Sequence, residues 1–346
     1  PSCSLFVLNI GIIFTIIFLY ANLGIIAAAF GYIIGGAMSM LYMIAVSTRK
    51  YRFCFVFDFK DEFLKKTLKQ TIPVVWSTSI AEINAVINRM IASFLFVGSI
   101  SALSYANKIN SIFISFFITA VATIVYPLYA ESSAKKNIEQ LSDRVNFTLS
   151  LYTMILTPIV VSVLCLRKEI VSVAFARGVF DASAVGATSS LLGCYCLGLL
   201  FMSFRETLTK VFYSMQDMKT PAKNATIGVL LNVGLNLTLP FVLGVEGLAL
   251  GTSFTAMFIS LRLLYLLKNK YEQIQLIFFQ KNLIGIIAST AIMAIVIVVF
   301  LYQYNENNNI IRLIVGATVC VVSYLLSIWL FRVPVFRHAK NMIFGR

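Results

Sequence analysis

Polar and charged side chains follow one face of each of two neighbouring apolar segments, residues 71–97 and 102–127. On the second segment they recur at steps of three and four residues: Ser101, Ser104, Lys108, Ser111 and Ser115. Such steps place side chains on one face of an α-helix. The first segment carries a similar row with other polar residues beside it: Ser77, Thr78, Glu82, Asn84, Ala85, Asn88 and Arg89. Basic groups flanked by hydroxyls and amides suit the binding of phosphate oxygens.

The charges on these two segments need an explanation, because an ionisable group at the centre of a membrane helix costs about 2.5 to 3.5 kcal/mol. One explanation is that Arg89 and Lys108, each about 10 Å from the nearer end of its segment, extend to the membrane surface. That explanation does not account for the accompanying serines and asparagines. A water-filled cavity that binds an anionic headgroup accounts for both. The predicted substrate-binding residues are therefore Glu82, Arg89, Ser101, Ser104, Asn107, Lys108 and Ser111.

The composition of the whole chain predicts a membrane protein. The 346 residues are 59% hydrophobic and only 12% charged, whereas about a quarter of the residues of a soluble domain are charged. Ten apolar segments are each long enough to cross a hydrocarbon core of about 30 Å as a helix. We expect an all-α polytopic membrane protein with about ten transmembrane helices: 4–20, 23–46, 71–97, 102–127, 148–166, 184–204, 222–243, 245–267, 283–302 and 310–331. Pro158 interrupts the segment 148–166 and predicts a kink there.

The distribution of lysine and arginine predicts the orientation. Basic residues concentrate in the loops after every second segment and in the C-terminal tail, while the opposite loops carry only Arg167, Lys168 and Arg177. Cytoplasmic loops retain positive charge, so both termini of the chain are expected in the cytoplasm. This asymmetry accounts for most of the net charge of +14 without a nucleic-acid partner.

Several kinds of chemistry are disfavoured by what the chain contains. The six cysteines are scattered, mostly within apolar segments, and Cys194 and Cys196 lack partners for a metal site. The single histidine, His338, lies in the tail. These features argue against an enzyme that depends on histidine for acid–base or metal chemistry. An integral membrane glycosyltransferase would need acidic residues or histidines in large extracytoplasmic loops, and the only such loop of any length is 166–183.

Four sequence motifs carry a family resemblance. Residues 101–108 (SALSYANK), followed by Tyr126-Pro127, resemble a signature of the lipid II flippases of the MurJ/MviN type, in the multidrug/oligosaccharidyl-lipid/polysaccharide exporter superfamily. Three further signatures are similar and stand in the expected order: 176–180 (ARGVF), 212–221 (FYSMQDMKTP) and 247–253 (GLALGTS). In this family a Tyr-Ala-x-Arg pattern occurs at the first motif, so Lys108 stands where the family has an arginine. The substitution keeps the charge but loses the guanidinium fork.

The resemblance implies a fold of fourteen helices in two lobes, with a final helix pair that forms a lipid-facing groove. This chain resembles helices five to fourteen. It begins at Pro1, without methionine, so we expect an N-terminally truncated fragment. On this reading residues 1–70 hold the last two helices of the first lobe and a cytoplasmic linker. Residues 71–267 are the six-helix second lobe, and 268–346 hold a linker, the groove-forming helices and the basic tail.

A second cluster of polar residues could hold a cation. Asn232 and Asn236, four residues apart on one segment, present oxygens to the same side; Thr252 on the next segment and Asn88 could complete the cluster. Oxygen ligands suit hard cations such as sodium. The resemblance implies sodium binding between these helices in some family members, with acidic residues at the positions of Asn88 and Asn236. Both are neutral here, and interhelical hydrogen bonds worth about 1 kcal/mol each are the alternative.

The function that the resemblance implies is the flipping of undecaprenyl-diphosphate-linked peptidoglycan precursor, lipid II, across the bacterial cytoplasmic membrane by alternating access. Basic cavity residues would bind the diphosphate, the prenyl chain would stay in membrane lipid, and the cell-wall synthesis machinery would be a partner. The alternatives are an exporter of another polysaccharide lipid or a drug of the same superfamily, or an inactive truncated remnant. No cofactor is expected other than a sodium ion at the four residues named above.

Overall fold

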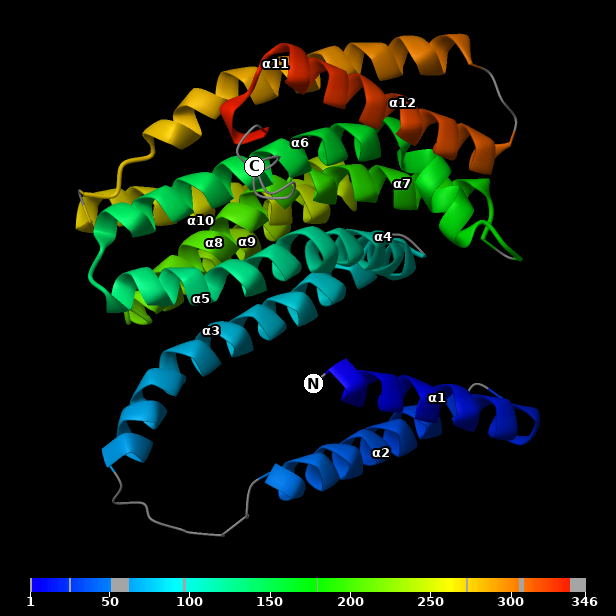
Figure 1. Ribbon diagram of the computed structural model, residues 1–346. Helices are drawn as coiled ribbons and strands as arrows, with labels where there is room; N and C mark the ends of the chain where they lie inside the picture. The colour runs from blue at the N-terminus through cyan, green and yellow to red at the C-terminus, as the bar shows by residue number, and fades with distance from the viewer. Residues whose placement is uncertain are drawn as a thin grey trace. The chain divides into compact units, whose positions relative to one another are not determined.

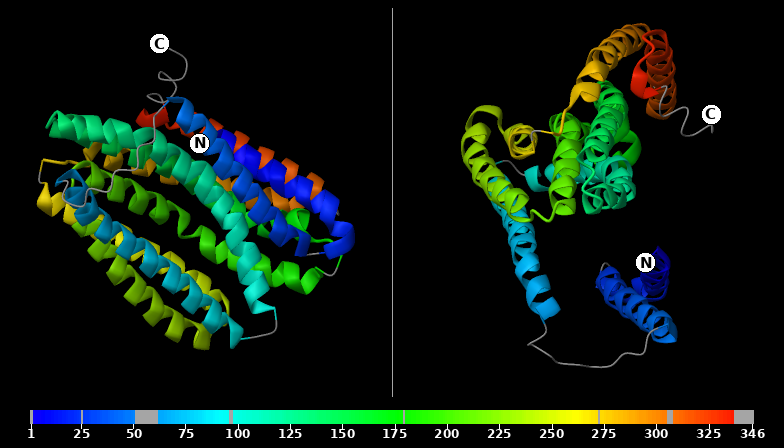
Figure 2. Two further views of the ribbon diagram at one scale, coloured as in Figure 1. Left: turned by 90° about the horizontal axis from the view of Figure 1, so that it is seen from below. Right: turned by 60° about the vertical axis from the view of Figure 1, so that its left-hand side comes forward.

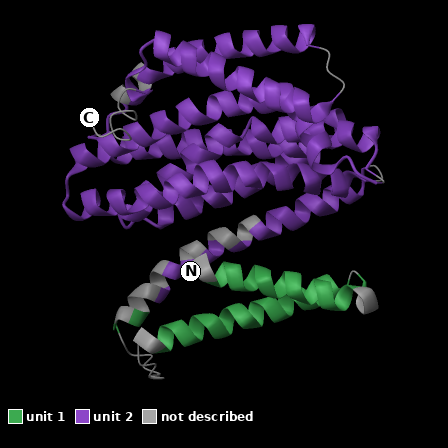
Figure 3. Cartoon of the chain, turned by 45° about the vertical axis from the view of Figure 1, so that its right-hand side comes forward, with its two compact units in different colours: residues 1–66 green, residues 67–346 purple. Residues whose placement is uncertain are grey.

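The computed structural model describes residues 2–24, 26–50, 62–95, 98–178, 180–271, 273–304 and 308–336. Within these ranges all regular secondary structure is helical, in twelve α-helices and one π-helical segment (Figure 1). The predicted all-α class is therefore confirmed. The chain divides into two compact units, residues 1–66 and 67–346 (Figure 3).

The first unit is a helical hairpin of α1 (Ser2–Leu23) and α2 (Ile26–Lys50). Glycine permits close contact between its two helices. A Cβ atom at Gly35 would lie 2.6 Å from the carbonyl oxygen of Leu8, and one at Gly31 would lie 3.2 Å from that of Ile12. The Gly-x-x-x-Gly spacing of α2 is therefore used for packing inside this hairpin.

Most of α3 (Glu62–Ser93) lies in the second unit, and this helix ends before a turn at Gly98 with φ of 96°. A long, continuous apolar helical segment follows, made of α4 (Ser99–Phe113), the π-helical η1 (Ile114–Thr119) and α5 (Ala120–Ala134). The hydroxyl of Tyr152 donates a 2.7 Å hydrogen bond to the carbonyl of Ile118 within the π-helical segment. Gly98 suits the turn because a residue without Cβ adopts positive φ at no steric cost.

The remaining helices are α6 (Ile138–Phe175), α7 (Ala182–Cys196), α8 (Leu199–Ser214), α9 (Lys219–Leu243), α10 (Glu246–Lys270), α11 (Ile277–Gln303) and α12 (Asn309–Leu330). The pair α7–α8 covers the predicted segment 184–204 and is bent by 41° at its break. Antiparallel α9 and α10 lie side by side, as Figure 2 shows. The turn before α9 is fixed by Asp217, which accepts hydrogen bonds from the backbone and hydroxyl of Thr220 and a 2.6 Å salt bridge from Lys270.

The predicted kink at Pro158 is wrong in its position. Pro158 lies inside α6, and the backbone leaves the helical region at Leu166, with φ −105° and ψ 16°. Pro158 cannot donate a hydrogen bond to the carbonyl of Met154, four residues earlier. The hydroxyl of Tyr324 on α12 donates to that carbonyl instead, at 2.7 Å. The helix therefore continues through the proline, because a neighbouring helix satisfies the freed carbonyl.

In the described part of the chain, seven helices are long and apolar enough to cross a membrane, or eight if the bent pair counts as one span. The predicted segment 4–20 is a shorter apolar helix, and the segment 71–97 falls largely on α3, which is not among the seven. The helices α11 and α12 pack over α6 (Figure 1). An ion pair joins α12 to α6, with 3.1 Å between Nε of Arg312 and the carboxylate of Glu169.

Candidate functional site

A cavity of about 210 Å³ lies where the last turns of α3 meet α4 and α7. Its lining includes most of the predicted substrate-binding residues. Arg89 comes from α3, while Ser104, Asn107, Lys108 and Ser111 come from α4. The remaining lining residues are Ala85, Asn88, Ala92, Ile100, Leu103 and Tyr195. The structure thus brings two cations, an amide and two hydroxyls to one cavity.

The amphipathic pattern of α4 positions these side chains. Ala102, Ala106 and Ile109 are buried on one face of the helix, while Asn107 and Lys108 are exposed on the other. Steps of three and four residues keep each set on its own face. Small alanines on the buried face allow α4 to approach α7 closely. The helix is therefore held by its apolar face and presents the basic one to the cavity.

The charged groups of this cavity are available to a ligand. Among the described residues, the side chains of Arg89 and Lys108 have no salt-bridge or hydrogen-bond partner. The hydroxyls of Ser104 and Ser111 donate to carbonyls of their own helix, Ile100 at 2.7 Å and Lys108 at 2.8 Å. The guanidinium, the ammonium and the amide nitrogens of Asn88 and Asn107 can then donate to a bound anion. Two cations without a carboxylate among the lining residues select for negative charge.

Two of the predicted residues lie outside this cavity. Ser101 lines a different cavity of about 390 Å³, together with Tyr105, Arg177 and Phe180 among others. Glu82 is exposed on α3 and does not line the cavity around Lys108. A binding role for Ser101 and Glu82 stays a prediction.

The second predicted cluster forms a chain of hydrogen-bonded amides between α3, α9 and α10. The amide nitrogen of Asn236 donates to the oxygens of Asn88 at 2.5 Å and Asn232 at 2.8 Å. The nitrogen of Asn232 donates to the hydroxyl of Thr255 at 3.2 Å. The oxygen of Asn236 lies directly against Gly251, where any Cβ would collide with it. These buried amides tie the end of α3 to α9.

Thr252 is not part of this chain. Its hydroxyl donates to the carbonyl of Leu248 at 3.1 Å, and Thr255, one turn further along α10, takes the place that sequence reasoning assigned to Thr252. In the described residues no group of three or more histidine, cysteine, aspartate or glutamate side chains could hold a metal. Asn88 and Asn232 each already accept a hydrogen bond at the side-chain oxygen. Sodium binding by Asn88, Asn232, Asn236 and Thr252 stays a prediction.

The sequence analysis assigned no role to Arg205 or Arg262, two charged residues within the helical bundle. Arg205 follows directly after the predicted segment 184–204, and no role was predicted for it. The helix α8 continues to Ser214, and Arg205 lines a cavity between α8, α9 and α10. The alternation of Thr207, Thr209 and Lys210 with apolar residues beyond position 204 was the signal that the helix continues.

A comparison with protein families matches residues 1–316 to the family described as "Lipid II flippase MurJ". Among curated proteins, the "Probable lipid II flippase MurJ" of Rickettsia prowazekii (strain Madrid E) is 28% identical over 92% of this chain and 65% of the relative. The protein of the same description from Buchnera aphidicola subsp. Acyrthosiphon pisum (strain APS) is 27% identical over 94% of this chain and 65% of the relative. The chain therefore spans about two thirds of the length of these relatives.

A solved structure described as "Lipid II flippase MurJ, inward closed conformation" superposes with a TM-score of 0.74. The two chains are 26% identical, and the match covers 96% of this chain and 67% of the other. The helical arrangement described above is thus shared over nearly the whole length of this chain.

Proposed function

The chain belongs to the lipid II flippase MurJ family, and on that premise we propose that it moves a lipid-linked peptidoglycan precursor across the bacterial cytoplasmic membrane. The observation that carries this proposal is the cavity between α3, α4 and α7, where Arg89 and Lys108 face one space without a salt-bridge partner among the described residues. Unpaired cations in a membrane protein mark a substrate pathway more often than a structural feature.

The diphosphate of the substrate is the group that fits this cavity. Lys108 acts as a compact point charge for the phosphate oxygens, and Arg89 supplies a planar fork that binds two oxygens at once. The amide of Asn107 adds a neutral donor beside Lys108. The prenyl chain needs no polar site and remains in membrane lipid. Binding energy at the diphosphate then holds the headgroup in the cavity while the protein changes the side to which the cavity opens.

The positive charge of the cavity also favours an anionic lipid-linked substrate over a cationic drug. A transporter for cationic drugs needs acidic residues in its cavity, and Glu82, the acid closest in sequence, lies outside it. The bias of lysine and arginine toward alternate loops supports an orientation with both termini in the cytoplasm. In that orientation Lys108 lies nearer the external end of its helix.

Replacement of Lys108 by alanine tests the proposal. The variant is expressed in a bacterium whose own flippase can be switched off, and the amount of precursor that reaches the outer leaflet is measured. We expect Lys108→Ala to reduce translocation by about tenfold or more, since a lost charge-assisted contact costs about 1.5 to 3 kcal/mol. Lys108→Arg should retain most of the activity, because arginine keeps the charge.

The matched control is Lys135→Ala. Lys135 is 64% exposed and pairs with Glu131 at 2.7 Å, far along the chain from the cavity. This variant should translocate as well as the original protein. Undiminished translocation in Lys108→Ala, at equal amounts of folded protein in the membrane, would remove Lys108 from the substrate pathway.

A further inference from the structure

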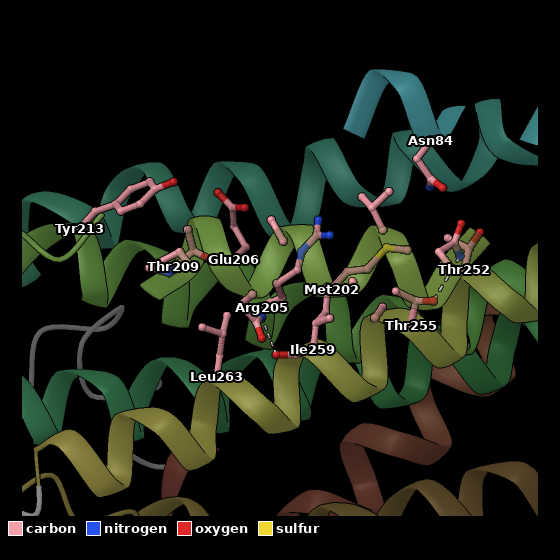
Figure 4. Close-up of a pocket in the computed structure, with 17 residues that line it drawn as sticks. Asn84, Met202, Arg205, Glu206, Thr209, Tyr213, Thr252, Thr255, Ile259 and Leu263 are labelled. Carbon is pink, nitrogen blue, oxygen red and sulfur yellow. Dashed lines mark hydrogen bonds between the residues drawn. The ribbon is translucent and has the colours of Figure 1, made fainter. Parts of the chain in front are cut away.

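A second polar cavity, of about 340 Å³, lies between α8, α9 and α10 and is drawn in Figure 4. Arg205, Glu206 and Thr209 line it from α8, and Asn232 and Thr255 line it from α9 and α10. Asn84 reaches it from α3. This cavity contains neither Lys108 nor Arg89, so it is distinct from the cavity assigned to the diphosphate.

The charges around this cavity do not balance. Glu206 is neutralised by Lys210, with 3.5 Å between the ammonium and the carboxylate. The guanidinium of Arg262 donates a 2.7 Å hydrogen bond to the amide oxygen of Asn224, which is itself in the cavity wall. Arg205 has no hydrogen bond or salt bridge to any described residue. Two guanidinium groups therefore face or flank the cavity without a carboxylate of their own.

Neutral donors and acceptors line the same cavity as Arg205. The hydroxyls of Thr209 and Tyr213 line the same space from α8 (Figure 4). The side-chain oxygen of Asn84 is buried without a hydrogen-bond partner among the described residues. Rotation of this amide about its terminal bond presents its NH₂ group to the cavity instead. The buried oxygen of Asn84 is costly unless a ligand or water satisfies it. Arg205 is exposed, so its guanidinium is accessible to an anion that enters the cavity.

The amide chain separates the two cavities. Asn88 lines the cavity of Lys108, whereas Asn232 and Thr255 line the cavity of Arg205, and Asn236 connects the two sets by hydrogen bonds. The two cavities share no lining residue.

We propose that the cavity around Arg205 is a second anion-binding site, which takes a carboxylate or phosphate group. The guanidinium of Arg205 binds two oxygens of the anion, and Thr209 and Asn84 donate to the remaining ones. The anion comes either from an acidic group of the lipid-linked substrate or from free inorganic anion. The first source rests on the proposed function, and the second does not.

The test measures binding of inorganic phosphate to the purified protein in lipid nanodiscs. Lys108→Gln serves as the background, because it removes a cation from the first cavity. Thermal unfolding is followed as phosphate is titrated at constant ionic strength. We expect saturable stabilisation of Lys108→Gln by phosphate, and about tenfold or more weaker apparent binding when Arg205→Gln is added. Arg205→Lys should restore part of the affinity, which shows that the loss is not one of folding.

Three results would overturn the second site: no saturable effect of phosphate on Lys108→Gln, an equal effect with and without Arg205→Gln, or no recovery with Arg205→Lys. Addition of the lipid-linked precursor then identifies the source. Competition with phosphate at Arg205 assigns the site to the substrate, and absence of competition assigns it to free anion. If phosphate binding at Arg205 fails while Lys108→Ala still reduces translocation about tenfold or more, the second site is overturned and the proposed function stands.

Discussion

Single residues in this protein differ in whether their polar groups are already satisfied. Lys108 and Arg205 are cations without a salt bridge in the described part of the chain, while the amide nitrogen of Asn236 donates to Asn88 and Asn232 and that of Asn232 donates to Thr255. A cation without a partner in a cavity can bind an anion, whereas amide hydrogens that are already donated hold neighbouring helices together. This difference decides which residues we assign to ligands.

The amide chain makes a prediction about sodium. Asn236→Asp places a carboxylate between Asn88 and Asn232, where it offers anionic oxygen to a hard cation. We expect the melting temperature of this variant to rise by several degrees when sodium chloride replaces potassium chloride. The protein with Asn236 should melt at the same temperature in both salts, since neutral amides already bonded to one another bind sodium weakly.

Asn236→Leu is the control for this measurement, because it removes the amide without adding charge. It should lower the melting temperature equally in both salts, by breaking hydrogen bonds worth about 1 kcal/mol each. Specific stabilisation of the unmodified protein by sodium would show that the neutral cluster does hold the ion, as the sequence pattern first suggested.

How far residue positions could be predicted depends on the geometry of the helix. Steps of three and four residues place Ser101 and Lys108 on one face of α4, and likewise Glu82 and Arg89 on α3. Seven residues also span about 10 Å along the helix axis. The pattern therefore predicted which face of each helix is polar, but not how far along the helix axis the cavity extends. Ser101 lines a different cavity from Lys108, and Glu82 lines neither of these two cavities. Arg205 was not predicted as a cavity residue because it follows the apolar segment 184–204, whereas the helix α8 continues to Ser214.

At the level of helices, the joint between α6 and α12 shows how a proline is accommodated. Pro158 leaves the carbonyl of Met154 without its helical donor, and Tyr324 supplies a hydroxyl at 2.7 Å. A break occurs eight residues later at Leu166, which packs against Gly316 of α12. Sequence reasoning expected the kink at the proline because it could not include a donor from a helix far along the chain.

This joint predicts coupling between two residues. Tyr324→Phe removes the hydroxyl and should destabilise the protein by about 1 to 2 kcal/mol, since it leaves a buried carbonyl unsatisfied. In a Pro158→Ala background the backbone N–H of residue 158 can bond to Met154, so Tyr324→Phe should then cost much less. The free energy of unfolding of the four proteins in a double-mutant cycle gives the coupling.

The control pair for this cycle is Tyr304→Phe with Pro158→Ala, because Tyr304 lies at the far end of α11. These two changes should be additive. Additivity of Tyr324→Phe and Pro158→Ala as well would mean that the hydroxyl does not replace the missing helical donor.

At the scale of the whole molecule, the order of the helices could be predicted from the sequence. The number of helices long and apolar enough to cross a membrane could not. The ten apolar segments coincide with described helices because a continuous apolar run in a membrane can only be helical. Among the described residues seven helices are long and apolar enough to cross a membrane, since the apolar helix 4–20 is short, Gly198 separates α7 from α8, and polar residues dilute α3. Three of the polar residues of α3, Asn84, Asn88 and Arg89, line the two cavities.

The orientation of the molecule is the last prediction. Lys135 lies in the loop between α5 and α6, and Ala182 lies at the start of α7 on the opposite side of the predicted membrane. With the six native cysteines replaced, single cysteines are introduced as Lys135→Cys or Ala182→Cys and treated with a membrane-impermeant maleimide. We expect Ala182→Cys to react in intact cells and Lys135→Cys to react only after permeabilisation, because lysine-rich loops stay in the cytoplasm.

Both introduced cysteines should react once the membrane is permeabilised, which controls for access of the maleimide. The reverse pattern would place both termini outside the cell. In that case Lys108 would lie nearer the cytoplasmic end of its helix, and the diphosphate would meet the basic cavity at the start of transport instead of near its end.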